Sequence, residues 1–122
     1  VGQGVRIALG TDSLASNPDL DVLAEARFIH ERYPDLPGEQ LLRMATLNGA
    51  EALGFGPTTG SLEPGKSADL VVVPLPGRDE RDPYELLLGS EPPAGGRTRW
   101  WRGRPGTAQD LPRIRSNTQQ PR

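Results

Sequence analysis

The chain has 122 residues, 34% of them hydrophobic, with 15 glycines, 13 prolines, a formal net charge of −2 and a pI near 5.4. This length allows one small domain, and the acidic balance excludes a generally basic nucleic-acid-binding protein. The absence of cysteine excludes disulfides and thiolate metal sites, and a single histidine excludes a site built from several imidazoles of this chain. No apolar run approaches ~18 residues and no basic stretch precedes an apolar one, so we expect neither a membrane span nor a signal peptide.

The first half of the chain predicts one strand followed by two helices. Apolar residues alternate along Val5–Leu9, which is typical of a strand. One helix is expected over residues 20–32, with Asp19 or Asp21 as its N-terminal cap and a proline beyond its end. A second helix is expected to open at Pro37 and to end at Gly54 or Gly56, because proline suits a first helical position and glycine a helix end.

The second half predicts short elements joined by turns. A wholly apolar run is expected to form a buried strand, and a β-prone run carries two tryptophans that would point to opposite faces. The expected elements are a turn at 60–65, the buried strand Leu70–Val73, a loop at 76–83, a helical turn at 84–88, a strand at 98–102 and a turn at 103–105. Residues 106–122 hold little apolar content and are expected to be disordered.

The sharpest chemical feature is the sequence G-T-D-S at residues 10–13, between the first strand and the first helix. A carboxylate at that place lies at the mouth of a βα unit, where barrel enzymes carry their catalytic groups. Asp12 can there ligate a divalent metal and transfer a proton to a leaving nitrogen. On this local pattern alone, a turn- or helix-capping aspartate is the favoured interpretation.

A second motif reads M-A-T-L-N-G-A-E-A-L-G at residues 44–54, followed by T-G-S-L-E-P-G-K-S-A-D-L-V-V-V at 59–73. Its side chains suggest no chemistry, and its small residues Ala45, Gly49 and Ala52 are expected to allow close packing. Taken together and in this order, the two motifs resemble the C-terminal part of the amidohydrolase superfamily. The run L-G-T-D-S-L-A-S-N-P-D-L-D resembles the cytosine-deaminase and chlorohydrolase-like branch, which includes deaminases of S-adenosylhomocysteine, methylthioadenosine and aminofutalosine.

The resemblance implies an α/β fold, namely a C-terminal fragment of a metal-dependent (β/α)8 barrel hydrolase with part of its small β-sandwich. Residues 1–56 would be the last barrel strand and the helices after it, residues 57–105 the C-terminal part of the β-sandwich domain, and residues 106–122 a disordered tail. Asp12 matches the family's metal-contacting proton shuttle at the end of the last strand. The resemblance also places Ser13, Ser16 and Asn17 at the substrate-binding rim.

The metal-binding histidines of that family are missing from this chain. The family holds its zinc or iron mainly with an H-x-H pair and two further histidines, and a barrel needs ~250 residues. His30, the single histidine, lies within the first expected helix and is interpreted as a helix-face residue rather than a ligand. We therefore expect a fragment of a longer hydrolase that holds no metal by itself, whereas the full-length parent would hold a divalent metal.

The resemblance implies hydrolysis of a carbon–nitrogen bond other than a peptide, with deamination of a purine-nucleoside-like or other heterocyclic small molecule as the expected reaction. A non-catalytic truncated product or a small interaction module is the alternative. We expect a cytoplasmic protein that binds neither nucleic acid nor membrane. The full-length parent could form a homo-oligomer. Trp100 and Trp101 beside four arginines suggest a nucleic-acid patch, but a sandwich edge strand with one buried tryptophan is favoured.

Overall fold

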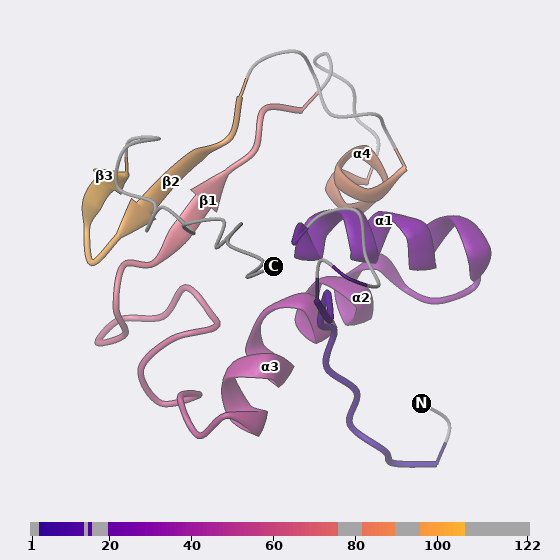
Figure 1. The fold of residues 1–122 in the computed structure, drawn as a ribbon, viewed down its shortest axis with the longest axis horizontal. Helices are drawn as coiled ribbons and strands as arrows, with labels where there is room; N and C mark the ends of the chain where they lie inside the picture. Colours follow the sequence, from indigo (N-terminus) through magenta and orange to yellow (C-terminus); the bar gives the residue numbers. More distant parts are fainter. Residues whose placement is uncertain (1–2, 14, 16–19, 76–81, 90–95, 107–122) are drawn as a thin grey trace, which may run out of the picture.

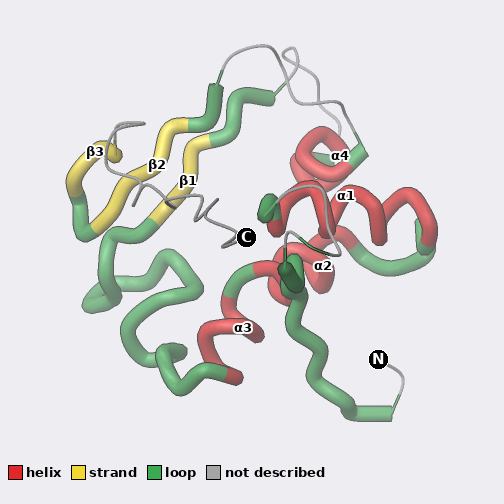
Figure 2. Tube along the Cα trace, viewed as in Figure 1, coloured by secondary structure: helices red, strands yellow, loops and turns green. Residues whose placement is uncertain are grey.

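The structure is a computed structural model that describes residues 3–13, 15, 20–75, 82–89 and 96–106. Within these ranges the chain forms four helices and one antiparallel sheet of three strands, which lies beside the helices in Figure 1. Loops make up much of the remainder, and a long one joins the third helix to the first strand (Figure 2). The elements are α1 (Val22–Arg32), α2 (Gly38–Ala45), α3 (Leu47–Ala52), β1 (Leu70–Val72), α4 (Pro83–Leu88), β2 (Thr98–Trp101) and β3 (Arg104–Gly106). None of the described helices is both long and apolar enough to cross a membrane.

Helix α1 begins at its cap, Asp21, one of the two residues that the sequence suggested. The Asp21 carboxylate accepts hydrogen bonds from the backbone amides of Leu23 and Ala24, at 3.0 and 3.4 Å. These amides belong to the first turn, where no helical carbonyl is available to them. The helix ends at Arg32, before Tyr33 and the proline that follows it, so the prediction of this helix is confirmed.

The second predicted helix is wrong in one respect, because it is two helices. Residues 38–45 and 47–52 are helical, but Thr46 between them has φ −131° and ψ −90°. Its hydroxyl donates to the carbonyl of Leu42 at 2.8 Å, a local side-chain bond that helices with threonine often accommodate by bending. Pro37 is the N-cap of α2 rather than its first residue. Gly54, with φ +80°, ends the helical region as expected.

The hydrophobic core lies among the helices. Ala26 of α1 and Leu41 of α2 are completely buried, and Met44 and Leu88 complete the cluster. Helix α4 is held onto α1 by two polar contacts as well as by packing. Arg27 Nε donates to the carbonyl of Leu87 at 2.9 Å.

The second of these contacts belongs to the single histidine. His30 is 9% exposed and lies in the α1–α4 contact, with its Nε2 3.3 Å from a carboxylate oxygen of Glu85. Its Nδ1 has no hydrogen-bond partner among the described residues. The structure thus places His30 on a packed helix face, as the sequence interpretation held, and adds the partner on α4.

The sheet differs from expectation in its burial and in its last turn. Leu70 pairs with Trp100 and Trp101 pairs with Arg104 in antiparallel register. The turn is at Arg102 and Gly103, both with positive φ, and residues 104–106 form a third strand instead of the expected turn.

The expectations of a buried Leu70–Val73 strand and of one buried tryptophan are wrong in this structure. Val71 and Val72 are about half exposed, Trp100 is 36% exposed and Trp101 66%. The physical reason is that no second layer covers the sheet among the described residues, whose helices pack on one another. The expectations for residues 76–81 and 107–122 lie outside the described residues.

Candidate active site

The candidate site stands at the end of an extended segment, residues 5–9, that leads to Asp12. The backbone amide of Leu9 donates to the carbonyl of Met44 at 2.9 Å, and the side-chain amide of Asn48 donates to the carbonyl of Ile7 at 2.7 Å. The segment is extended but forms no ladder with another described strand, so the predicted strand is not realised as part of a sheet. One of its edges is instead bonded to groups at the break between α2 and α3.

Asp12 itself has an unusual backbone conformation, with φ +58°. Aspartate is one of the few residues other than glycine that enter this region, and such conformations gather at functional sites. The residue is exposed, as is the neighbouring Ser13. The structure therefore places Asp12 at the surface, three residues beyond the end of the segment, and its roles as catalytic residue and metal ligand stay predictions. Ser16 and Asn17, the other two expected site residues, lie outside the described residues.

The described residues do not bring three potential metal ligands together. No group of three or more His, Cys, Asp and Glu side chains with suitable spacing occurs in the described part of the chain. A zinc site needs at least three protein ligands. Asp12 can supply one carboxylate, so the donor set found here does not by itself fit a complete metal centre.

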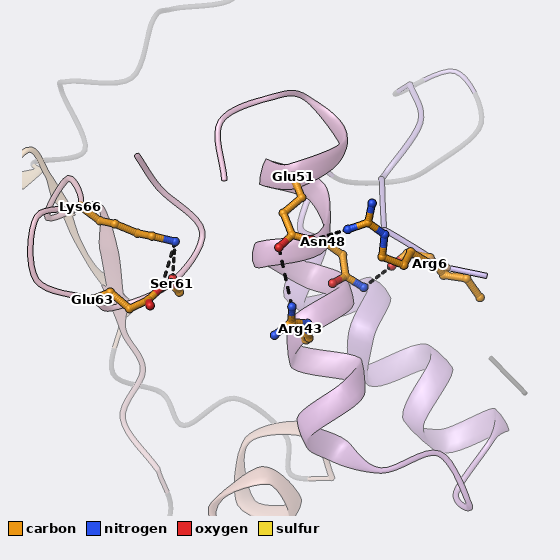
Figure 3. A network of polar contacts seen from close by, with 8 residues as sticks. Arg6, Arg43, Asn48, Glu51, Ser61, Glu63 and Lys66 are labelled. Carbon is orange, nitrogen blue, oxygen red and sulfur yellow. Dashed lines mark hydrogen bonds and ion pairs between the residues drawn. The ribbon is translucent and has the colours of Figure 1, made fainter. Parts of the chain in front are cut away.

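A polar network that sequence analysis missed holds the segment to α3 (Figure 3). Arg6 Nη1 is 3.1 Å from Glu51 Oε2, and the other Glu51 oxygen is 3.7 Å from Arg43 Nη2. Asn48 lies next to this ion pair and makes the bond to Ile7 described above. Glu51 and Asn48 both belong to the motif at 44–54, which had suggested packing and no chemistry. The signal in the sequence that could have revealed this network is the spacing of Asn48 and Glu51, which are three positions apart and so lie on one face of α3.

A second polar cluster stabilises the turn after α3. Lys66 Nζ donates to the hydroxyl of Ser61 at 2.7 Å and lies 3.0 Å from a carboxylate oxygen of Glu63, which Ser61 also contacts (Figure 3). The hydrogen bond from Ser61 and the charge of Lys66 lower the pKa of Glu63 below its ordinary value. These contacts are within the G-S-L-E-P-G-K sequence, and we assign them to the turn.

An open apolar groove runs along the segment on the side of α1 and α2. It has a volume of about 500 Å³ and an almost wholly apolar lining. The lining residues are Ile7, Leu9, Ile29, Tyr33, Asp35, Leu36 and Met44. A groove of this kind, beside an extended segment that is hydrogen-bonded along one edge, is a surface on which additional polypeptide can pack.

Barrel enzymes carry their catalytic groups at the C-terminal ends of their strands, and Asp12 lies three residues beyond the end of the extended segment. A profile of the amidohydrolase family matches residues 1–98. The chain belongs to the amidohydrolase family, which confirms the family inferred from the two motifs. Membership implies a (β/α)8 barrel for the parent fold, of which the described residues form only a few elements.

Several named proteins are similar to this chain. A 5-methylthioadenosine/S-adenosylhomocysteine deaminase of Syntrophomonas wolfei is 44% identical over 91 residues, covering 69% of the chain and 21% of that protein. A 5'-deoxyadenosine deaminase of Methanosarcina acetivorans is 45% identical over 80 residues, 60% of the chain and 18% of that protein. The crystal structure of an adenosine deaminase from Xanthomonas campestris with bound zinc matches with a TM-score of 0.70 and 37% identity, covering 83% of this chain and 25% of that one. The chain thus spans about a fifth of the length of the curated relatives it matches.

Proposed function

We propose that this chain is the part of an adenosine-type nucleoside deaminase that supplies Asp12 to the active site. The observation that carries the proposal is the position of Asp12, exposed and in a left-handed conformation, within the region that matches the amidohydrolase family. The relatives named above act on adenosine-type molecules by their names, which favours an aminopurine nucleoside as the small-molecule substrate.

In the proposed reaction, water adds to the ring carbon that bears the amino group, and the bond from that carbon to the amino nitrogen breaks. The Asp12 carboxylate accepts a proton from the attacking water and delivers it to the departing nitrogen, which leaves as ammonia. Asp12 would contribute one carboxylate to a divalent metal, which would supply Lewis-acid activation of the water. Ser13 adjoins Asp12, and we place it with Ser16 and Asn17 at the rim that contacts the substrate.

The metal of this proposal, zinc or iron, needs ligands beyond the described residues. Asp12 offers one carboxylate, and the described part of the chain contains no cluster that completes the set. The structure similar to this chain was solved with zinc. We therefore assign the remaining ligands to the part of the parent enzyme that the relatives possess and this chain does not span.

The division of the chain follows from the same proposal. Residues 1–56 would be the last strand and following helices of the barrel, and residues 57–105 part of the sandwich. The open edge of the 5–9 segment and the apolar groove beside it would then be covered by the remainder of the barrel. Burial of about 500 Å³ of apolar groove would add hydrophobic stabilisation that the 122-residue chain lacks.

The test is Asp12→Asn in the full-length enzyme that carries residues 1–122. Asparagine has almost the same shape but cannot accept the proton, so we expect ammonia release to fall by at least ~10²–10⁴-fold with the fold intact. Methylthioadenosine, S-adenosylhomocysteine, 5'-deoxyadenosine and adenosine are the substrates to compare. Glu31→Gln, a change of the same kind at an exposed position of α1, is the matched control. Near-wild-type turnover in Asp12→Asn would show that this aspartate is only a turn residue and would refute the proposal.

A further inference from the structure

The break between α2 and α3 lies against the segment that leads to Asp12. Met44, the next-to-last residue of α2, presents its carbonyl to the amide of Leu9, and Asn48 of α3 presents its side-chain amide to the carbonyl of Ile7. In an unbroken helix the carbonyl of residue 44 would face the amide of residue 48 along the helix axis. Because the chain turns at Thr46, a carbonyl and a side-chain donor instead face the segment together.

These two bonds meet the segment as a neighbouring strand would. In extended chain, residues two apart direct their backbone groups to the same side, so Ile7 and Leu9 share one edge. A neighbouring strand bonds such an edge with alternating acceptors and donors, and the Met44 carbonyl and the Asn48 amide supply one of each. The helix break therefore substitutes for a strand partner along this edge.

The ion pairs next to Asn48 constrain the position of the 5–9 segment less than the Asn48 hydrogen bond does. The side chains of Arg6, Glu51 and Arg43 are 79, 31 and 56% exposed, so solvent screens their attraction. Their flexible stems also allow several geometries. The Asn48 amide is short, lies within the helix and acts directly on the backbone at 2.7 Å. Of the side-chain contacts made to the segment, it constrains the backbone position most closely.

We propose that Asn48 is a positioning residue for Asp12, which it places by fixing the segment five residues earlier in the chain. This inference rests on the proposed function of Asp12, since a catalytic carboxylate needs its place set to a fraction of an ångström. Asn48 touches neither substrate nor metal in this proposal. It acts through the carbonyl of Ile7 and the short connection to Asp12.

The test uses Asn48→Asp and Asn48→Ala in the full-length enzyme. Aspartate keeps the size of the side chain but has no donor for the Ile7 carbonyl at pH 8, whereas alanine removes the side chain and favours the helix. Gln40→Ala, an exposed amide on α2 outside the network, is the control. Two quantities are measured: kcat and KM for the adenosine-type substrate, and amide hydrogen exchange of the peptide that spans residues 3–13.

We expect both variants to exchange this peptide about fivefold faster, which corresponds to the net worth of one hydrogen bond. Since small displacements of reacting groups cost up to ~10² in rate, kcat should fall about 10- to 100-fold while KM stays within about threefold. Gln40→Ala should match the wild type in both measurements.

Three results would overturn the inference: unchanged exchange, unchanged kcat despite faster exchange, or a loss confined to KM. The exchange measurement needs no catalytic activity. A wild-type enzyme without deaminase activity would therefore refute the proposed function, whereas normal exchange in both Asn48 variants would refute the role of Asn48.

Discussion

Asp21 combines two stabilising contacts that substitution can separate. Its Oδ1 caps α1 through the amides of Leu23 and Ala24, and its Oδ2 lies 2.6 Å from Arg97, which precedes β2. The residue therefore joins the helices to the chain that enters the sheet. Asp21→Asn keeps an oxygen for the cap and removes the charge, whereas Asp21→Ala removes both contacts.

The expected magnitudes follow from these contacts. Loss of an N-cap costs about 1 kcal/mol, within a range of ~0.5–2. The side chains of Asp21 and Arg97 are 30 and 32% exposed, so the ion pair is expected to contribute up to about 1 kcal/mol after solvent screening. We expect the free energy of unfolding to fall by about 2 kcal/mol in Asp21→Ala and by ~0.5–1 kcal/mol in Asp21→Asn.

The assay is urea unfolding of the 122-residue chain, followed by far-ultraviolet circular dichroism at several pH values. With a urea slope of ~1–2 kcal/mol/M, the midpoint should fall by about 1–2 M in Asp21→Ala and by less than ~1 M in Asp21→Asn. The hydrogen bond from Arg97 holds the pKa of Asp21 below its ordinary value of 3.8. The stabilisation from the charge is therefore fully present above 3.8 and is lost as the pH falls through the lowered value. The difference between wild type and Asp21→Asn should be constant near neutral pH and shrink in acid.

Asp35→Asn removes the same charge in the loop between α1 and α2 and is expected to leave the midpoint nearly unchanged. Equal losses in Asp21→Ala and Asp21→Asn would show that the cap contributes nothing. Midpoints at the wild-type value in both, or a difference between wild type and Asp21→Asn that does not shrink in acid, would refute the reasoning for the ion pair.

Two further predictions concern glycine packing and metal binding. Gly38→Ala would place a Cβ 2.6 Å from Tyr84 Cβ, so the α2–α4 contact must open, at a cost of about 1–3 kcal/mol in the free energy of unfolding. In Gly49→Ala, within α3, the new Cβ meets nothing within 4 Å, so the free energy of unfolding should rise by ~0.5–1 kcal/mol. The urea midpoints of the two variants should move in opposite directions, and a shared direction would contradict the packing described. Calorimetric titration of the 122-residue chain with zinc should show no sub-micromolar site, because the described residues bring no three ligands together; tight stoichiometric binding would show that the chain completes a site alone.

The elements set by local chemistry were readable from the sequence. Asp21 precedes an apolar helical pattern and a proline follows its end, so α1 was predicted nearly to its limits. Gly54 adopts the positive φ that ends the helical region. Asp12 was singled out because it follows a β-prone run, and the structure exposes it there.

Features decided by distant parts of the chain could not be predicted in the same way. Threonine is tolerated in helices, and the bend at Thr46 accompanies bonds to a segment some 40 residues earlier, of which the Asn48–Ile7 bond spans 41 positions. Glu85, the partner of His30, is 55 positions away. The small residues of the 44–54 motif suggested close packing, yet a Cβ at Gly49 would meet nothing within 4 Å. The exposure of Trp101 depends on whether a second layer covers the sheet, and the sequence pattern of a strand carries no information about such a layer.

In the order β1-β2-β3, the outer strands β1 and β3 each have one side that pairs with no other described strand and carries backbone donors and acceptors. Val71 and Val72 on the first of these strands are about half exposed, and charged side chains that would discourage strand addition are few there. The isolated 122-residue chain therefore offers a template for self-association, and its tendency to aggregate should rise with concentration. Solubility of the isolated chain would then depend on keeping these two edges occupied or charged.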